Sequence, residues 1–509
     1  MKEVVLGRWI IPDAQGDVTE NGAVVIENGR IVAVGPADRL CREHGDAAVS
    51  GDRECAIMPG LINAHHHSSA ASHVQHGAPD MLLESWLKAL AVMRRSPTRL
   101  DILLSATRQL QGGVTTVVDF ASLSGSAEEV AVTCESALRA YDTVGMRCAF
   151  GPGIGDQNFL GVGPGDCDER FLANLPGDLG ERLRSHYMPG AERMTAADYI
   201  GFMEDLIGAW NAHERIDVWF GPPGPPWVSD PFLELIGDAA SRLDVNIQTH
   251  VSESYYEKLQ GPKFHGTPVL VHLHRLGLTG PRLSLAHGVW MTEEEIAIMA
   301  ETGTAVSHNP SSNLRLRAGI APLTAFLDAG VVTALGMDST TINDDEDMFA
   351  EMRLALRLAR APTYHESAPS PGDVLGCATR GGATLMRKDD QLGRLAPGLA
   401  ADLLLIDMTA ATMPWVAPEA SPRDLALMKV RGADVRDVMV AGEWVLKDRL
   451  PTRFNLDDAI RELHEVMAAT PFPASSRDLA LEALPHVEAW YGSWDHPPRQ
   501  PYTAMNSRT

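Results

Sequence analysis

Residues 59–67 of this 509-residue chain read Pro-Gly-Leu-Ile-Asn-Ala-His-His-His, an apolar stretch that ends in three histidines. A short apolar run that follows a Pro-Gly pair is typical of a buried strand. Side chains at positions i and i+2 of a strand point to the same side, so His65 and His67 can reach one ion while His66 points away. The stretch therefore predicts a strand whose C-terminal end carries two metal ligands.

After this first strand, short apolar segments alternate with helical segments as far as residue 390. The expected strands are residues 61–64, 115–118, 147–150, 217–220, 245–249, 283–286, 305–307 and 333–336. Eight strands in βα alternation fit an α/β fold of the (β/α)8 TIM-like barrel type. Residues 151–197 form a long insertion after the third strand, at a place where βα loops cover the active site of such a barrel.

The two ends of the chain carry β elements of a different kind. Residues 22–35 predict a hairpin, because Asn28-Gly29 accepts positive φ at both central positions of a type I′ turn. Similar strands return at residues 401–407 and 438–446, so we predict a small β-sandwich domain built from both termini. The predicted parts are residues 1–58 (first part of the sandwich), 59–390 (barrel), 391–450 (second part of the sandwich) and 451–509 (a helical and aromatic tail).

The composition excludes several classes of partner. Lys and Arg number 43 against 67 Asp and Glu, a net charge of −24, and such a surface repels nucleic-acid phosphates and anionic lipids. No apolar segment reaches the roughly 18 residues that a membrane span needs, and the N-terminal residues lack the apolar region of a signal peptide. The six cysteines include no CxxC pair and suit a reducing compartment. We therefore expect a cytoplasmic protein with no nucleic-acid or membrane partner.

Three more of the predicted strands end in residues that bind metals. The fifth ends at His250, the sixth at His287 and the eighth at Asp338. The C-terminal ends of barrel strands open onto one face, so these side chains would meet His65 and His67 there. Imidazoles combined with a carboxylate suit zinc, and also iron or nickel. The sequence therefore predicts a divalent-metal centre on this face.

In these motifs the chain resembles the amidohydrolase superfamily, and more narrowly its cytosine deaminase, guanine deaminase and atrazine chlorohydrolase branch. The resemblance covers residues 1–450 and is carried by PGLINAHHH (59–67), THVSES (249–254), LAHGVW (285–290), VSHNPSSN (306–313) and LGMDS (335–339). It implies a hydrolytic deaminase that releases ammonia from an amino-substituted N-heterocycle of the purine, pterin, pyrimidine or triazine type.

The resemblance also implies a metal site with four ligands, namely His65, His67, His250 and Asp338. Binuclear members of the superfamily carry a bridging lysine on strand four, and residues 217–221 contain none. One divalent ion is therefore expected, with zinc as the first choice and iron or nickel as alternatives.

The resemblance assigns catalytic roles to Glu253, His287 and Asp338. A divalent metal lowers the pKa of its water toward ~7, so metal-bound hydroxide forms at neutral pH. Asp338 can accept the water's proton, and His287 would orient the water or polarise the forming oxyanion. Glu253 lies three residues after His250, where it can protonate a ring nitrogen next to the attacked carbon. Attack at a C–NH2 carbon then expels ammonia.

Three further residues are predicted to contact the substrate. Trp86 matches a Trp-Leu pair near the pocket of relatives, and His308 ends the seventh strand, although both have an alternative interpretation as core side chains. Trp227 lies in the Pro-rich loop after strand four, from which it could stack on a flat ring.

Two departures from adenosine-type relatives bear on the substrate. Those relatives have Arg-Gly where this chain has His76-Gly77, and a histidine where it has Pro223. The missing polar groups serve nucleoside-like substrates, so their absence counts against adenosine and S-adenosylhomocysteine. A flat aminated heterocycle such as a guanine, pterin, pyrimidine or triazine fits better.

Two alternatives stay open. The same site could release chloride, an alkylamine or the nitrogen of a cyclic amide or urea, because Asp338 fits deaminases and chlorohydrolases alike. A non-catalytic barrel that acts as a structural oligomer is more remote, since every predicted ligand is present. Relatives are commonly oligomers, so we expect a homodimer or higher homo-oligomer whose partner is a small heterocyclic substrate.

Overall fold

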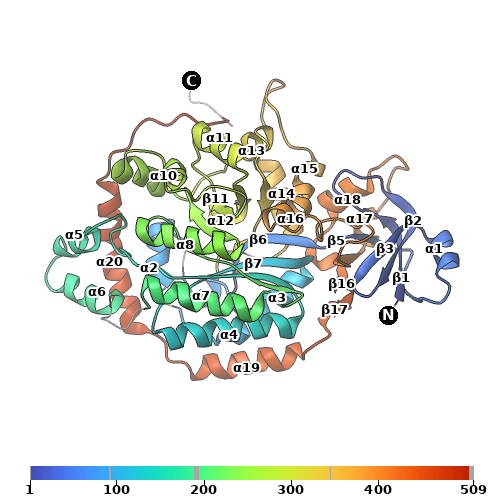
Figure 1. Cartoon of the computed structure of the whole chain (residues 1–509), viewed down its shortest axis with the longest axis horizontal. Coiled ribbons are helices and arrows are strands. Elements are labelled where there is room, and N and C mark those ends of the chain that lie inside the picture. The colour runs from blue at the N-terminus through green and yellow to red at the C-terminus, as the bar shows by residue number, and fades with distance from the viewer. Residues whose placement is uncertain (1, 79, 91–92, 189–193, 344, 504–509) are drawn as a thin grey trace.

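The computed structural model describes residues 2–78, 80–90, 93–188, 194–343 and 345–503. It is a mixed α/β fold in which helices surround two parallel sheets, with a third sheet at the end of the molecule that carries the N-terminus (Figure 1). Helices α5 (Cys167–Ala173) and α6 (Leu179–Tyr187) lie at the opposite end (Figure 1).

The two parallel sheets carry all eight strands that the sequence predicts. One sheet has the order β14-β6-β7-β8-β9 and the other has the order β10-β11-β12-β13. The bounds are β6 (Leu61–His67), β7 (Val114–Ser122), β8 (Arg147–Gly153), β9 (Ile216–Val218), β10 (Ile247–Val251), β11 (Leu283–His287), β12 (Ala305–His308), β13 (Thr333–Leu335) and β14 (Asp338–Ser339). The predicted alternation is confirmed, and several strands extend beyond the predicted ends toward the site.

The two parallel sheets approach each other at both edges. An isolated parallel bridge joins Phe220, just after β9, to Ile247 at the start of β10. At the other edge β13 leads directly into β14, which pairs with β6 in a register that places Asp338 opposite His66. This register fixes the height of the eighth strand end relative to the histidines of the first.

The third sheet joins the two ends of the chain, and it has nine strands in the order β18-β17-β16-β15-β5-β1-β2-β3, with β4 paired to β1. The bounds are β1 (Lys2–Ile10), β2 (Thr19–Glu27), β3 (Arg30–Pro36), β4 (Ala48–Gly51), β5 (Cys55–Pro59), β15 (Leu403–Asp407), β16 (Val435–Val440), β17 (Glu443–Lys447) and β18 (Leu450–Pro451). The predicted Asn28-Gly29 hairpin is confirmed, with φ of 50° and 77° at these two residues. Antiparallel pairing of β5 with β15 brings the two ends together.

The remaining elements are helices and short helical turns. Besides α5 and α6, their bounds are α1 (Ala37–Glu43), η1 (Val74–His76), α2 (Leu83–Ala89), α3 (Thr98–Gln111), α4 (Ala127–Val144), α7 (Ala196–Trp210), α8 (Asp230–Leu243), α9 (Tyr255–Gln260), η3 (Gly261–His265), α10 (Val269–Arg275), α11 (Glu293–Thr302), α12 (Pro310–Arg315), α13 (Leu323–Asp328), α14 (Met348–Leu358), α15 (Pro371–Gly376), η4 (Cys377–Gly381), α16 (Gly382–Leu385), α17 (Thr409–Thr412), α18 (Pro422–Lys429), η5 (Gly432–Asp434), α19 (Leu456–Ala469) and α20 (Ala474–Gly492). Within the described ranges, none of these helices combines the length and the apolar character that a membrane crossing requires.

The C-terminal tail contains one helix that the sequence predicts and one that it does not. The helix predicted in the tail is confirmed as α19 (Leu456–Ala469). The second helix, α20, begins before the aromatic stretch and packs against α2 and α6. Its buried residues Ala480, Ala483 and Val487 follow helical spacing, so this signal was present in the sequence. The last residues of the predicted tail, 504–509, and residues 189–193 of the predicted insertion lie outside the described residues.

Candidate metal and catalytic site

The side chains predicted at the strand ends come together at one cavity of about 1570 Å³. His67, His250, His287 and Asp338 line it, and the buried His65 lies beside them, with its ring centroid 4.8 Å from those of His67 and His250. His65 and His67 come from the end of β6, His250 from β10, His287 from β11 and Asp338 from β14. The four histidines lie at or near C-terminal strand ends, and Asp338 begins the two-residue β14 just after the end of β13, which is why residues up to 273 positions apart share one site. His66 points away as predicted, and its Nε2 lies 3.1 Å from Ser105 Oγ on α3.

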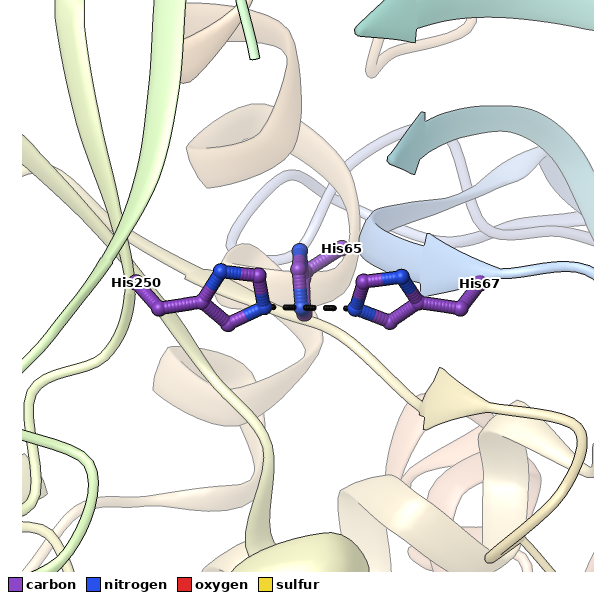
Figure 2. Close-up of side chains that lie close together, drawn as sticks. All are labelled: His65, His67 and His250. Atoms are coloured by element: carbon purple, nitrogen blue, oxygen red, sulfur yellow. Dashed lines mark hydrogen bonds between the residues drawn. The ribbon is translucent and has the colours of Figure 1, made fainter. Parts of the chain in front are cut away.

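The tautomers of His67 and His250 are set by backbone carbonyl groups. His67 Nδ1 donates to the Phe120 oxygen at 2.9 Å, and His250 Nδ1 donates to the Pro223 oxygen at 2.7 Å. A carbonyl oxygen can only accept, so each Nδ1 carries the proton and each Nε2 presents a lone pair. These two Nε2 atoms face each other at 3.2 Å (Figure 2). Two facing lone pairs repel, so the arrangement favours a cation bound between them.

His65 and Asp338 complete the convergence. His65 Nδ1 donates to Gln248 Oε1 at 2.9 Å, and Gln248 Nε2 donates to the Ala64 oxygen at 2.8 Å, which orients the amide. His65 Nε2 has no hydrogen-bond partner within the described ranges and points toward the gap between His67 and His250 (Figure 2). Asp338 Oδ1 lies 3.5 Å from the Nε2 atoms of both His65 and His67. Three imidazole nitrogens and one carboxylate oxygen fit a divalent metal, with outer hydrogen bonds that hold the rings.

The backbone is strained at three positions of the site. Asp338 has φ of 57°, His287 of 75° and Ser252 of 53°, values that side chains other than glycine seldom adopt. Each such residue costs of order 1–3 kcal/mol and persists only where its surroundings enforce it. Around Asp338, the Ser312 hydroxyl donates to Oδ2. At these positions the left-handed backbone turns the chain away from the strand direction, next to the cavity.

Glu253 and His287 lie beside the four predicted ligands. His287 Nε2 is 3.6 Å from Glu253 Oε2 and 3.8 Å from Asp338 Oδ2, and His287 Nδ1 donates to Asn313 Oδ1 at 2.9 Å. Burial lowers the pKa of His287 to about 4, so its Nε2 keeps a lone pair at neutral pH. Burial, and next the negative charge of Asp338, raises the pKa of Glu253 well above its usual range. Burial thus favours the neutral form of both groups, the carboxyl of Glu253 and the imidazole of His287.

The three predicted substrate contacts differ in their placement. Trp86 and Trp227 both line the cavity. The indole Nε1 of Trp86 donates to His73 Nδ1 at 2.9 Å, which fixes the ring in the wall. His308 is buried and, among the described residues, does not belong to the cavity lining, so its contact with substrate stays a prediction.

Several residues of the site were not predicted. Gln248 stands two positions before His250 on the same strand, so the period of two along β10 could have identified it. Phe120 lies at the cavity, with its ring centroid 4.9 Å from that of His250 and 5.2 Å from that of His67. Phe120 follows the predicted strand by two residues, and it was not predicted as a site residue because β7 is longer than expected. The role of Pro223 is exerted through its carbonyl and leaves no side-chain signal.

The outer part of the cavity is built from two segments that lie far apart in the sequence. Part of the insertion after β8, including Gln157 and Phe159, lines the cavity, as predicted for a covering loop. Part of the C-terminal tail, including Thr470 and Ser476, lines it as well. The sequence predicts a helical and aromatic tail here, and the structure shows that part of it forms a wall of the cavity.

The fold and the site define an α/β protein with a histidine and carboxylate centre suited to a divalent metal, next to a buried acid. The model of the amidohydrolase family matches residues 56–445, and a model described as the imidazolonepropionase-like composite domain of bacteria matches residues 22–47. The chain belongs to the amidohydrolase family, and it is a hydrolase.

A curated relative supports this placement. The 5-methylthioadenosine/S-adenosylhomocysteine deaminase of Syntrophobacter fumaroxidans is 30% identical over 91% of this chain and 97% of its own length. The similarity therefore includes the sheet formed by the chain ends as well as the parallel sheets.

Two solved structures are also similar. An adenosine deaminase from Xanthomonas campestris with bound zinc is 27% identical, with a TM-score of 0.77 over 92% of this chain and 98% of that one. An atrazine chlorohydrolase from Arthrobacter aurescens complexed with zinc is 22% identical, with a TM-score of 0.77 over 91% of this chain and 100% of that one. The second likeness shows the fold alone. Membership of the family and the zinc-bound adenosine deaminase support a divalent metal as the cofactor.

Proposed function

We propose that this enzyme is a metal-dependent deaminase that releases ammonia from an amino-substituted N-heterocycle. The observation that carries the proposal is the pair of Nε2 lone pairs of His67 and His250, which face each other at 3.2 Å with Glu253 nearby. A cation site next to a buried acid suits hydrolysis at an electron-poor ring carbon. The proposed ligands of a single ion are His65, His67, His250 and Asp338.

The proposed mechanism assigns one task to each of the residues Asp338, His287 and Glu253. A bound divalent cation acidifies a water molecule toward a pKa of ~7, and zinc is the first choice for three imidazoles and a carboxylate, with iron or nickel as alternatives. Asp338 accepts a proton from the attacking water. His287, with its Nε2 lone pair, orients that water. Glu253 donates its proton to the ring nitrogen next to the attacked carbon. The proton accepted by Asp338 then passes to the amino group, which leaves as ammonia, and the proton of the added hydroxyl returns to Glu253 as the ring C=O forms.

The proposed substrate class includes purines, pterins, pyrimidines and triazines, and adenine nucleosides are the first compounds to test. The cavity of about 1570 Å³ exceeds the roughly 300–1,000 Å³ of ordinary ligand pockets, so a ring with a substituent fits. The names of the curated relative and of the Xanthomonas structure point to adenine nucleosides. The departures at His76 and Pro223 point the other way. Pro223 uses its carbonyl to hold His250, which gives this position a task other than substrate binding.

We propose that the two parallel sheets form one closed (β/α)8 barrel over residues 59–390, because they meet at the Phe220–Ile247 bridge and at the β13–β14 connection. Residues 1–58 and 391–450 would form the β-sandwich. The apolar cluster that joins Val24, Ile57 and Leu403 supports a sheet folded over its own core. The expected homo-oligomeric state stays a prediction, which analytical ultracentrifugation tests.

The decisive experiment is a substrate panel on the zinc-loaded enzyme. The panel contains adenosine, 5'-deoxyadenosine, 5-methylthioadenosine, S-adenosylhomocysteine, guanine, an aminopterin ring and amino- and chlorotriazines, with separate assays for ammonia, chloride and ring opening. We expect ammonia from at least one aminated ring. If no compound yields ammonia but some yield chloride or a ring-opened product, the alternative leaving groups are supported. The same site residues would then catalyse that hydrolysis.

Two variants separate metal binding from proton transfer. His250→Ala should lose metal, because it removes one of the two facing Nε2 atoms. Glu253→Gln should keep about one equivalent of metal while turnover falls by about two to four orders of magnitude, as for loss of a general acid. Wild-type protein that holds less than a tenth of an equivalent, and gains no activity with zinc or iron, would support the structural-oligomer alternative. A fully active Glu253→Gln variant would refute the assignment of Glu253 as the proton donor.

A further inference from the structure

The segment that carries Glu253 leaves the end of β10 through a strained turn. Ser252 has φ of 53°, and this left-handed residue bends the chain so that the next side chain points into the cavity toward His287. Such a conformation needs support from its surroundings, since relaxation would swing the Glu253 carboxyl away from the reacting centre.

The support comes from Glu257, one turn later in α9. Its Oε2 accepts the backbone N–H of Glu253 at 2.7 Å. The amides of Ser252 and Ser254 also favour the charged form of this carboxyl. Glu257 therefore holds the backbone of the turn by a hydrogen bond at Glu253, the residue whose side chain is the proposed acid.

A second contact ties the same segment to helix α2, which contributes Trp86 to the cavity lining. The Ser254 hydroxyl donates to Glu84 Oε1 of α2. Trp86, which lines the cavity, lies two residues further along this helix. The proposed acid and the aromatic wall are thus fixed relative to each other through Ser254.

The start of helix α9 does not itself require a carboxylate at position 257. Ser254 is the N-cap residue, and its side chain already accepts the Glu257 N–H at 3.1 Å. Glu257 is buried, and burial raises its pKa to about 7, so its charge is costly to keep there. It borders a cavity of about 20 Å³, and its Oε1 has no hydrogen-bond partner among the residues the structure describes. A neutral apolar side chain would satisfy the packing better, which points to a task in the turn.

We infer that Glu257 is a positioning residue that holds the Glu253 turn, and with it the acid of the reaction, in the geometry required for proton transfer. The inference rests on the proposed function of Glu253. Misplacement of a reacting group by about 1 Å can cost on the order of 100-fold in rate, so this support bears directly on turnover.

The test is a double-mutant cycle on the zinc-loaded enzyme with Glu257→Gln, Glu253→Gln and the double variant. A glutamine keeps the size of the side chain but replaces the carboxylate, whose charged form strengthens the hydrogen bond from the Glu253 N–H. We expect Glu257→Gln to lower kcat by about 10- to 100-fold with KM changed less than threefold and metal content unchanged. In the Glu253→Gln background the same change should lower kcat less than twofold, because the side chain it positions is already gone.

Glu295→Gln is the matched control. Glu295 is equally buried, and its carboxylate also accepts backbone N–H groups, from Leu270 at 3.0 Å and Thr292 at 2.8 Å, but it lies outside the cavity lining within the described residues. We expect it to lower the unfolding midpoint about as much as Glu257→Gln and to leave kcat within twofold of wild type.

The outcomes separate the two levels of inference. If Glu253→Gln stays fully active, the proposed function of Glu253 fails. If Glu253→Gln is impaired but Glu257→Gln lowers kcat by the same factor in both backgrounds, or raises KM instead of lowering kcat, the positioning role is refuted. An unchanged kcat in Glu257→Gln refutes it as well.

Discussion

Glu346 links two of the loops next to the proposed metal site. Its replacement by glutamine should destabilise the protein in a pH-dependent way. Its Oε1 lies 3.2 Å from His66 Nε2 and accepts the Thr340 hydroxyl at 2.9 Å, while Oε2 pairs with Arg108. Arg108 in turn donates to the carbonyl oxygen of Ser69, just after β6, at 2.9 Å. The charge of Glu346 thus links the loop after β14 to the loop after β6.

The expected loss in the free energy of unfolding follows from the pKa of Glu346. Burial raises this pKa, but the hydrogen bond with His66 and the charge of Arg108 outweigh burial and lower it from 4.5 to about 2. Each pKa unit corresponds to about 1.4 kcal/mol, so the charged form contributes about 3 kcal/mol to the free energy of unfolding. The folded-state pKa is depressed, so this contribution is complete above pH 4.5 and is lost as the pH falls toward 2.

Urea unfolding of wild type and Glu346→Gln, both in chelator so that metal release does not contribute, checks this prediction. The difference in unfolding free energy should be about 3 kcal/mol at pH 7 and should shrink progressively below pH 4.5. Glu351→Gln is the control, because burial raises the pKa of that carboxyl to about 7, which gives the opposite sign. A wild-type advantage that is the same at pH 7 and pH 3, or is below about 1 kcal/mol at pH 7, would refute the electrostatic account.

Two further substitutions test how the parts are joined. Asp402→Asn should lower the free energy of unfolding by about 3–5 kcal/mol in urea, because it leaves the buried guanidinium of Arg147 without its charged partner at 3.0 Å. A loss below about 1 kcal/mol would show that Arg147 finds another acceptor. Gly153→Ala should destabilise by about 1–3 kcal/mol and weaken zinc binding in a chelator competition, because the added Cβ would lie 1.5 Å from the Gly221 oxygen and displace the segment whose Pro223 carbonyl holds His250. Wild-type zinc affinity in this variant would contradict the proposed coupling.

Much of the site could be predicted from local pattern because its residues obey simple geometric rules. A period of two places His65 and His67 on one side of β6, and parallel strands bring their C-terminal ends to one face. His250, His287 and Asp338 therefore follow from the strand assignments, and the structure brings all of them into one cavity. The residues at the strand ends could therefore be predicted without knowledge of long-range contacts.

Other features of the site could not be predicted from the sequence because they depend on contacts that no local pattern encodes. The tautomer of His250 is set by the carbonyl of Pro223, and any residue could supply a carbonyl there. The placement of Glu253 depends on the carboxylate of Glu257, which by sequence is one more glutamate at the start of a helix. The wall formed by Thr470 depends on how α19 and α20 wrap around α3 and α2.

The amino-acid sequence by itself determined the α/β alternation, the hairpins of the chain ends and the identity of the residues at the strand ends. These are consequences of hydrophobic period, turn chemistry and strand polarity, which act over a few residues. Only the tertiary structure decided which lone pairs meet, how the strained turns at Ser252, His287 and Asp338 aim their side chains, and how large a cavity the insertion and the tail enclose. Hydrogen bonds between residues far apart in the chain, and the burial that shifts the pKa of Glu253, exist only once the segments have packed.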